Sequence, residues 1–167
     1  MDLCHAKKIT IVGNSGAGKS TFANKLGASL GVDVFSIDKI YWLAGWRLRN
    51  PASFKKLHDK WLAQDAWIID GVGYWEQMAR RIVQSDCVVF LDVPVAVCKA
   101  RAETRIEQEK LTQNPHITPG CVYAEVKALQ IEVIEHFHNE LRPQLLEYLS
   151  GFNPEKIRVI SELEAGF

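Results

Sequence analysis

The sequence predicts an α/β fold in three layers, with a central five-stranded parallel sheet and helices on both of its faces. Two observations lead to this fold class. Short apolar runs alternate along the chain with stretches of helical periodicity, which is typical of repeated strand–helix–strand units. A glycine-rich stretch also follows the first of these runs directly. The expected strands are residues 8–12, 33–37, 67–70, 87–92 and 157–160.

Helical spacing of apolar residues fills the intervals between the strands. A first helix is expected to start at Lys19, directly after the glycine-rich stretch. A second is expected over 51–65, because Pro51 suits the first turn of a helix and apolar residues then recur at helical spacing. A third carries Trp75 and Ile82 on one face, before the strand at 87–92.

The second half of the chain is expected to hold two helices separated by a loop. Helical spacing resumes after Pro94 and weakens over the polar stretch 111–120, which contains two prolines and a glycine. The helical period returns over 122–141. Pro143 is expected to kink or restart this helix, and Gly151 to end it.

Composition bounds the function classes. With 167 residues and 47% hydrophobic content, residues 1–167 are expected to form a single domain. The 20 basic and 20 acidic residues balance, so no net field gathers nucleic acid or an anionic membrane surface, and direct nucleic-acid binding is not expected. No apolar run approaches the length of a membrane span, and the first eight residues lack the apolar core of a signal peptide. A cytoplasmic protein is therefore expected.

The cysteines do not indicate a disulfide framework or a metal centre. Cys4, Cys87, Cys98 and Cys121 are widely spaced and form no C-x-x-C pair, so reduced structural thiols are expected. His116 lies near Cys121, but two candidate ligands are too few for a zinc site.

Residues 13–20 form a complete G-x-x-x-x-G-K-[ST] phosphate-binding loop. Its glycines let backbone N–H groups turn toward phosphate oxygens, Lys19 supplies a positive charge to the β- and γ-phosphates, and the Ser20 hydroxyl can ligate Mg²⁺. We therefore expect ATP and Mg²⁺ as cofactors. The expected nucleotide contacts are Gly13, Asn14, Ser15, Gly16, Ala17, Gly18, Lys19, Ser20 and Thr21.

Three aspartates each close an apolar run. Asp38, Asp70 and Asp92 end the second, third and fourth expected strands. Because ligands of a parallel sheet bind at the carboxyl ends of its strands, all three are expected to face the same cleft as Lys19. Asp38 follows the first helix and is expected to orient or deprotonate a phosphoryl acceptor. The competing interpretation for each is a helix-capping or turn aspartate.

Arg101 and Arg105 lie four residues apart and hence on one helix face. Guanidinium groups there can stack on a base or neutralise phosphate charge. By spacing alone, a solvated face shared with the neighbouring glutamates explains them better.

The motifs together resemble the adenylate kinase-like P-loop kinases. The resemblance rests on GNSGAGKST, on the Asp70-Gly71 pair after its strand, and on Asp92-Val93-Pro94 followed by arginines nine and thirteen residues after Asp92. It implies that Arg101 packs on the adenine of ATP and that Arg105 contacts phosphates. It also implies that Asp70 approaches Mg²⁺ through water, beside the Ser20 ligand.

A closer similarity is to the topology modulation proteins (FlaR-type), a branch of small adenylate kinase relatives. It is suggested by the segments 37–42 and 45–46, by 67–71, by Gly120-Cys121, and by Leu141-Arg142-Pro143. The chain departs from the adenylate kinases after Gly71, where Val72-Gly73-Tyr74 replaces their F-P-R, and residues 106–141 contain no arginine. AMP is therefore expected to be a poor acceptor. The arginines that could replace those contacts are Arg47, Arg49, Arg80, Arg81 and Arg142.

An aromatic cluster follows Asp38. Tyr41, Trp42 and Trp46 could stack on a nucleobase at the acceptor side, or form a small core beneath the helix at 51–65. The sequence does not separate the two interpretations.

The sequence thus predicts an ATP-dependent phosphotransferase of the adenylate kinase-like type, with a small lid at about 106–120. Its partner would be a small-molecule acceptor, namely a nucleotide, a nucleoside or another hydroxyl compound, and no membrane. Two alternatives stay open. One is a nucleotide-dependent regulator of the DNA topology modulation type, and the other is an ATP-binding relative without transfer activity.

Overall fold

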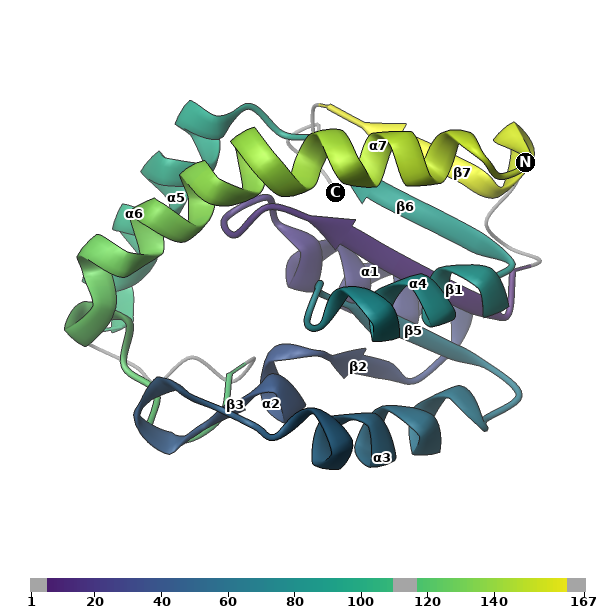
Figure 1. The fold of residues 1–167 in the computed structure, drawn as a ribbon, viewed down its shortest axis with the longest axis horizontal. Coiled ribbons are helices and arrows are strands. Elements are labelled where there is room, and N and C mark those ends of the chain that lie inside the picture. The colour runs from purple at the N-terminus through teal and green to yellow at the C-terminus, as the bar shows by residue number, and fades with distance from the viewer. Residues whose placement is uncertain (1–5, 110–116, 162–167) are drawn as a thin grey trace.

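The computed structural model describes residues 6–109 and 117–161. Its centre is a parallel sheet of five strands in the order β2-β5-β1-β6-β7 (Figure 1). The strands are β1 (Lys8–Gly13), β2 (Val34–Ser36), β5 (Trp67–Asp70), β6 (Cys87–Leu91) and β7 (Ile157–Ile160). The α/β fold with a five-stranded parallel sheet is confirmed, and the expected strands agree with the observed ones within one or two residues.

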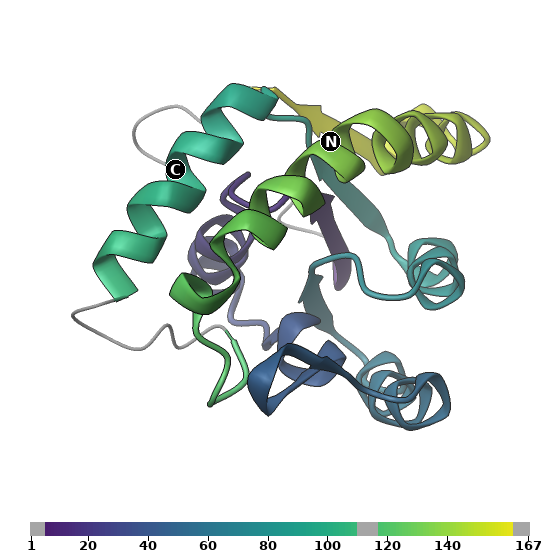
Figure 2. The ribbon, with the colours of Figure 1, turned by 60° about the vertical axis from the view of Figure 1, so that its left-hand side comes forward.

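The central strands β5, β1 and β6 are buried and mostly apolar because helices cover both faces of the sheet. Helices α1 (Lys19–Leu30) and α5 (Val95–Glu109) share a core with β1, β5 and β6 on one face. Helices α3 (Pro51–Leu62), α4 (Trp75–Gln84) and α7 (Arg142–Ser150) pack on the other. Figure 2 shows the three layers, with the sheet between the two groups of helices.

Two helices follow the polar stretch 111–120 in the sequence, with short irregular turns before, between and after them. A 3₁₀ turn at Tyr123–Val126 leads into α6 (Lys127–His136), and a π-helical turn at Phe137–Leu141 joins α6 to α7. The predicted restart is confirmed: Pro143 lies in the first turn of α7, where a missing N–H leaves no hydrogen bond unmade. The wide π turn lets the chain change direction without leaving a helical path. A last 3₁₀ turn, Pro154–Lys156, precedes β7.

A small hairpin after β2 was not predicted. The chain forms one helical turn, α2 (Asp38–Tyr41), and then β3 (Trp42–Leu43), a 3₁₀ turn at Ala44–Trp46 and β4 (Arg47–Leu48). The two strands pair antiparallel. Strands of two residues are too short for an alternating pattern, so sequence periodicity gives no signal for them. We call residues 38–48 the acceptor hairpin.

Residues 117–126 pack against the tip of this hairpin. The Gly45 N–H donates to the Gly120 carbonyl at 2.8 Å, and the Trp46 indole N–H donates to the Val122 carbonyl at 2.9 Å. The Thr118 hydroxyl lies 3.0 Å from the Trp42 carbonyl. These contacts join two segments that lie more than seventy residues apart in the sequence.

Part of the predicted lid lies outside the described residues. Residues 106–109 belong to α5, residues 117–120 pack on the acceptor hairpin, and 110–116 are not described. Cys4 and His116 also lie outside the described part of the chain. Within it, Cys87, Cys98 and Cys121 are free thiols, and no helix combines the length and apolar character that crossing a membrane requires.

Candidate active site

The glycine-rich loop lies between β1 and α1, and its backbone geometry demands glycine. Gly16 has φ +80°, and a Cβ atom placed there would lie 2.3 Å from the Cys98 carbonyl oxygen of α5. Gly18 adopts φ 93° as the residue that caps α1. An alanine at Gly16 would therefore meet both an unfavourable backbone conformation and a steric clash.

Hydrogen bonds to α6 and to Lys19 hold the loop in place. Asn14 is buried, and its side-chain amide donates to the Ile134 carbonyl of α6 at 2.9 Å, while its carbonyl Oδ1 accepts the Ser15 N–H at 2.7 Å. The Lys19 ammonium donates to the Asn14 backbone carbonyl at 2.8 Å. These bonds position Lys19 at the start of α1, whose first turn carries no side-chain cap and no acidic residue. That turn therefore keeps its positive end for an anion.

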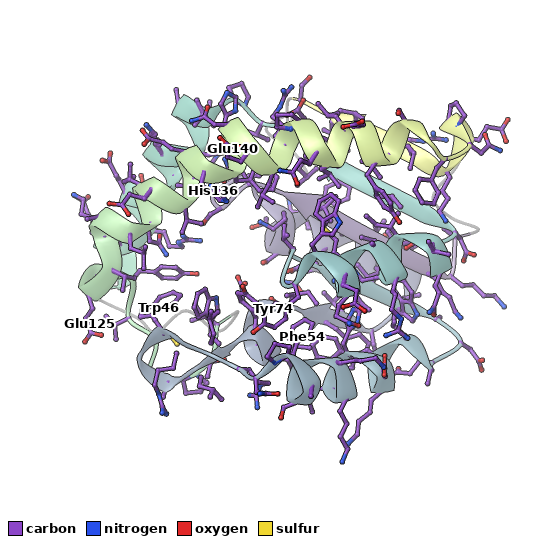
Figure 3. The ribbon with its side chains drawn as sticks, viewed as in Figure 1. Trp46, Phe54, Tyr74, Glu125, His136 and Glu140 are labelled. Carbon is purple, nitrogen blue, oxygen red and sulfur yellow. The ribbon has the colours of Figure 1, made fainter. Side chains whose placement is uncertain are left out.

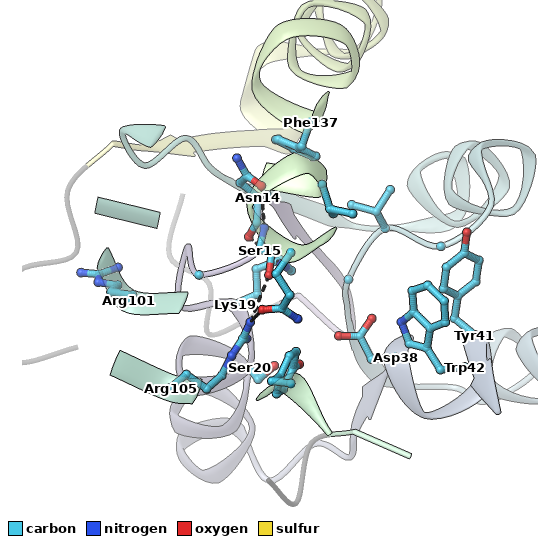
Figure 4. A pocket seen from close by; sticks show the side chains of 18 of the residues that line it. Asn14, Ser15, Lys19, Ser20, Asp38, Tyr41, Trp42, Arg101, Arg105 and Phe137 are labelled. Atoms are coloured by element: carbon cyan, nitrogen blue, oxygen red, sulfur yellow. Dashed lines mark hydrogen bonds between the residues drawn. The ribbon is translucent and has the colours of Figure 1, made fainter. Parts of the chain in front are cut away.

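A pocket of about 450 Å³ opens at the carboxyl ends of the strands, between the loop and the acceptor hairpin. Of the nine predicted nucleotide contacts, all but Ala17 line it. Ala17 is fully buried, and its carbonyl accepts from Arg101 instead. Figure 4 shows Asn14, Ser15 and Lys19 on one side of the pocket and Asp38, Tyr41 and Trp42 on the other.

Asp38 and Lys19 face this pocket together. Burial lowers the pKa of Lys19, and the negative charge of Asp38 opposes that effect. Burial raises the pKa of Asp38, and the positive charge of Lys19 opposes it. The two groups thus stabilise each other's charged forms in a partly desolvated site.

Asp70 and Asp92 differ from Asp38. Asp70 is 2% exposed at the end of β5, where its Oδ1 accepts the Ser36 hydroxyl at 3.2 Å, and it does not line the pocket. Asp92 does not face Lys19. It forms a two-pronged ion pair with the Arg142 guanidinium of α7 at 2.6 and 2.7 Å. The expectation that all three carboxylates face the same cleft was therefore wrong for two of them. Asp70 is buried against Ser36, and Asp92 pairs with a guanidinium from a helix that is distant in sequence.

Both predicted arginines of α5 line the pocket. Arg105 donates to the Ser15 hydroxyl at 3.3 Å and to the Gln130 side chain at 2.9 Å, and its guanidinium lies 3.9 Å from the centre of the Tyr123 ring. Arg101 is exposed and lies 3.4 Å from the Ala17 carbonyl of the loop. The structure thus joins these side chains to the phosphate-binding loop, in contrast to the solvated-face interpretation.

None of the five other arginines considered for the acceptor lines the pocket. Arg142 and Arg80 pair with Asp92 and Asp59, while Arg47, Arg49 and Arg81 donate to the carbonyls of Ala44, Ile40 and Gly71. Arg81 is fully buried, and burial lowers its pKa to about 9.

Tyr74 also points elsewhere. Its hydroxyl donates to the Arg49 carbonyl at 2.6 Å, and its ring packs edge-on against Tyr41 and Phe54. Tyr74 thus packs in the core under α3 and does not line the pocket.

The aromatic cluster packs on the core beneath α3 and also lines the pocket. Tyr41 packs on Phe54 at a ring distance of 5.9 Å, which ties it to the core beneath α3, while Trp42 and Trp46 pack edge-on at 5.4 Å. Trp46 continues the cluster to Tyr123 at 4.9 Å. The rings of Tyr41, Trp42, Trp46 and Tyr123 also line the pocket.

Sequence reasoning missed the roof of the pocket. Leu129, Gln130, Val133, His136 and Phe137 line it from α6 and the turn that follows. Their helical spacing is typical of a core stripe, and periodicity alone does not distinguish a helix face that covers a core from one that covers a pocket. Figure 3 shows His136 of α6 and Trp46 of the acceptor hairpin on opposite sides of this opening.

Comparison with known proteins gives a likeness in structure alone. Neither a protein-family model nor a curated protein matches the chain. Shikimate kinase from Acinetobacter baumannii, solved with shikimate, matches with a TM-score of 0.54 and 18% identity over 98% of this chain and 87% of that chain.

Two further solved structures are similar, with lower TM-scores. Shikimate kinase from Bacteroides thetaiotaomicron gives 0.48 at 19% identity, over 80% of this chain and 79% of its own. A gluconokinase from Sinorhizobium meliloti 1021 gives 0.47 at 13% identity, over 83% and 97%. The first match establishes that the chain has the α/β fold of P-loop kinases.

Proposed function

We propose that this protein is an ATP-dependent phosphotransferase that acts on a small hydroxyl compound. One observation carries the proposal: Lys19 of a complete phosphate-binding loop and the Asp38 carboxylate line the same pocket, and each affects the pKa of the other. A nucleotide-binding protein without an acceptor would not need a partly buried carboxylate opposite its phosphate site, because that carboxylate repels phosphate.

The loop fits a nucleoside triphosphate on observations of its own. The first turn of α1 has no side-chain cap, and three cationic side chains, Lys19, Arg101 and Arg105, line the pocket beside the loop. Mg²⁺ bound with ATP would neutralise phosphate charge, and Ser20 would hold it together with Asp70 through water. No group of three or more His, Cys, Asp or Glu side chains able to hold a metal occurs in the described residues. The nucleotide phosphates would therefore supply the other ligands.

The chain's residues then have separate tasks. Asp38 accepts a hydrogen bond from the acceptor hydroxyl and takes its proton as the oxygen attacks the γ-phosphorus. The bond between that phosphorus and the β,γ-bridging oxygen breaks, and ADP leaves. Lys19 and Arg105 stabilise the charge on the transferred group. Arg101, whose side chain is exposed beside the loop, packs on the adenine.

We also propose that the chain belongs to the topology modulation branch of these kinases. Two of the segments that carry this resemblance, 45–46 and 120–121, are distant in sequence but meet in the structure. Gly45 bonds to Gly120, and Cys121 lies 3.3 Å from the carbonyl of the neighbouring Leu43.

The test compares Lys19→Ala with Lys56→Ala, a matched change of an exposed lysine on α3 that does not line the pocket. ATP binding is measured by titration calorimetry, and ADP release is measured with candidate acceptors. Lys19→Ala is expected to abolish ATP binding and ADP release. Lys56→Ala is expected to keep both at the parent's level, and the circular dichroism spectra of both variants should match that of the parent.

Undiminished ATP affinity and turnover in Lys19→Ala would contradict the proposal. A different outcome is that the parent binds ATP and Lys19→Ala abolishes that binding, while no acceptor stimulates ADP release from the parent. This outcome would instead identify an ATP-binding relative without transfer activity.

A further inference from the structure

The two ends of the pocket differ in charge. The cations that line it, Lys19, Arg101 and Arg105, all stand at the phosphate-binding loop. At the other end, Asp38 is the only carboxylate among the described lining residues. The triphosphate of ATP would pair with these three cations. An acceptor bound at the other end would then lie beside a carboxylate, with no further arginine or lysine among the described lining residues.

The surface around Asp38 is apolar and aromatic. Trp42 and Trp46 line it from the acceptor hairpin, and both are partly buried. From the opposite side, Leu129 and Val133 of α6 line the pocket while 49% and 47% exposed. Large apolar side chains that stay exposed inside a pocket indicate that a ligand covers them.

An acidic acceptor does not suit this end of the pocket. A phosphate or carboxylate group bound beside Asp38 would lose hydration and be repelled by Asp38, while Lys19 and Arg105, whose charges reach Asp38, would already be paired with the triphosphate of ATP. A neutral acceptor has neither cost. Its hydroxyl can donate to Asp38 while a flat ring stacks on Trp42 or Trp46.

From these observations we infer that the acceptor is an uncharged molecule that joins a hydroxyl-bearing part to a flat ring, and that its chemical class is the nucleosides. This inference rests on the proposed function and specifies its substrate. The hydroxyl oxygen forms the new bond to phosphorus, its proton passes to Asp38, and the products are a nucleoside monophosphate and ADP.

The first experiment measures binding by calorimetry in the presence of saturating non-hydrolysable ATP analogue and Mg²⁺. The probes are the four ribonucleosides, their 5′-monophosphates and shikimate, a hydroxyl acid. At least one nucleoside is expected to bind ten times or more tightly than its own monophosphate and than shikimate. The same nucleoside is expected to stimulate ADP release from ATP.

The outcomes separate this inference from the proposed function. Equal or tighter binding of a monophosphate or of shikimate would overturn the inference, and so would a failure of all nucleosides to bind while the ATP analogue binds. A failure of the ATP analogue itself to bind would overturn the proposed function, and the inference with it.

A second experiment tests the ring-binding surface. Trp42→Leu keeps the apolar character but removes the aromatic face, and Trp42→Phe keeps a ring. Trp42→Leu is expected to raise the Kd of the nucleoside about tenfold, Trp42→Phe less than threefold, and neither to change the Kd of the ATP analogue. The matched control is Trp75→Leu on α4, which is 37% exposed and outside this pocket. An unchanged nucleoside Kd in Trp42→Leu would contradict the inference.

Discussion

Asp38 combines its proposed role as proton acceptor with a cost in stability. Because burial raises its pKa, the folded protein favours the protonated carboxyl more than the unfolded chain does. A proton acceptor must be the charged carboxylate, and this is the form that burial disfavours. The stability that Asp38 contributes is greatest below its unfolded pKa and is lost as the pH rises through its folded pKa.

We predict that Asp38→Asn lowers acceptor-stimulated ADP release by 10²-fold or more, because the amide cannot take the acceptor proton. Background hydrolysis of ATP should change far less. The same variant should raise Tm at pH 7, and this gain should shrink as the pH is lowered toward 4. A coupled ADP assay and thermal unfolding at several pH values measure both effects. Equal loss of hydrolysis and transfer would assign Asp38 to nucleotide binding instead.

The two arginines of α5 should separate kinetically. Arg105 is held on Ser15 and Tyr123 beside the phosphate site, so Arg105→Ala is expected to lower kcat by about 10²-fold or more through lost charge stabilisation. Arg101→Ala should mainly raise the KM for ATP. The matched control is Arg80→Ala, which breaks a surface ion pair on α4. Near-parental kinetics in both α5 variants would show that Arg101 and Arg105 are ordinary surface charges.

At the level of elements, the contact between the phosphate-binding loop and α5 depends on Gly16. A methyl group added at Gly16 would lie 2.3 Å from the Cys98 carbonyl oxygen. Gly31 provides a control, since it has a similar φ of +67° but an added methyl group would meet nothing within 4 Å.

We therefore predict that Gly16→Ala destabilises the fold by more than about 2 kcal/mol and abolishes ATP binding, because strain and clash act together. Gly31→Ala should cost about 1 kcal/mol and leave ATP binding intact. Urea unfolding and calorimetry measure the two quantities. Equal destabilisation by both substitutions would mean that the contact with α5 carries no energy of its own.

Helix α3 buries His58, whose ring stacks on Phe54. Both ring nitrogens of His58 lack a hydrogen-bond partner in the described part of the chain, and burial, with the charge of Arg81, lowers its pKa to about 3. A lowered folded pKa means that this residue's contribution to stability is present above pH 6.5 and is lost as the pH falls toward 3.

His58→Leu is expected to remove this dependence. The parent should lose about 2 kcal/mol of stability at pH 5 through the protonation of His58 in the unfolded chain, and the variant should not. The measurement is urea unfolding at pH 7.5 and pH 5. An identical loss in parent and variant would show that the pKa of His58 is the same in the folded and the unfolded chain.

At the scale of the whole molecule, 20 basic and 20 acidic residues balance. We predict that the protein is not retained on heparin at low salt, since binding to a polyanion needs a net or clustered positive charge. In the same preparation, ATP with Mg²⁺ at about 100 times its Kd should stabilise the fold by roughly 2.7 kcal/mol. Retention on heparin without acceptor-stimulated turnover would favour the DNA-directed regulator.

The strands and most helices were predictable because their signals are local. Apolar runs such as 87–91 and the helical spacing within α4 depend on residues that are close in sequence. The phosphate-binding loop was predictable for the same reason, as all its parts lie within eight positions. The acceptor hairpin was not predictable, because strands of two residues carry no period and are stabilised by residues 117–126.

The sequence by itself determined the fold class, the phosphate-binding loop, and the presence of Asp38 at a strand end. Only the tertiary structure decided which charged groups reach the pocket. Five arginines that do not line the pocket bind carbonyls or carboxylates, Arg142 pairing with Asp92 among them, while Leu129 and Val133 of α6 line the pocket. The physical reason is that such pairings depend on distances between residues far apart in the chain, which no local pattern encodes.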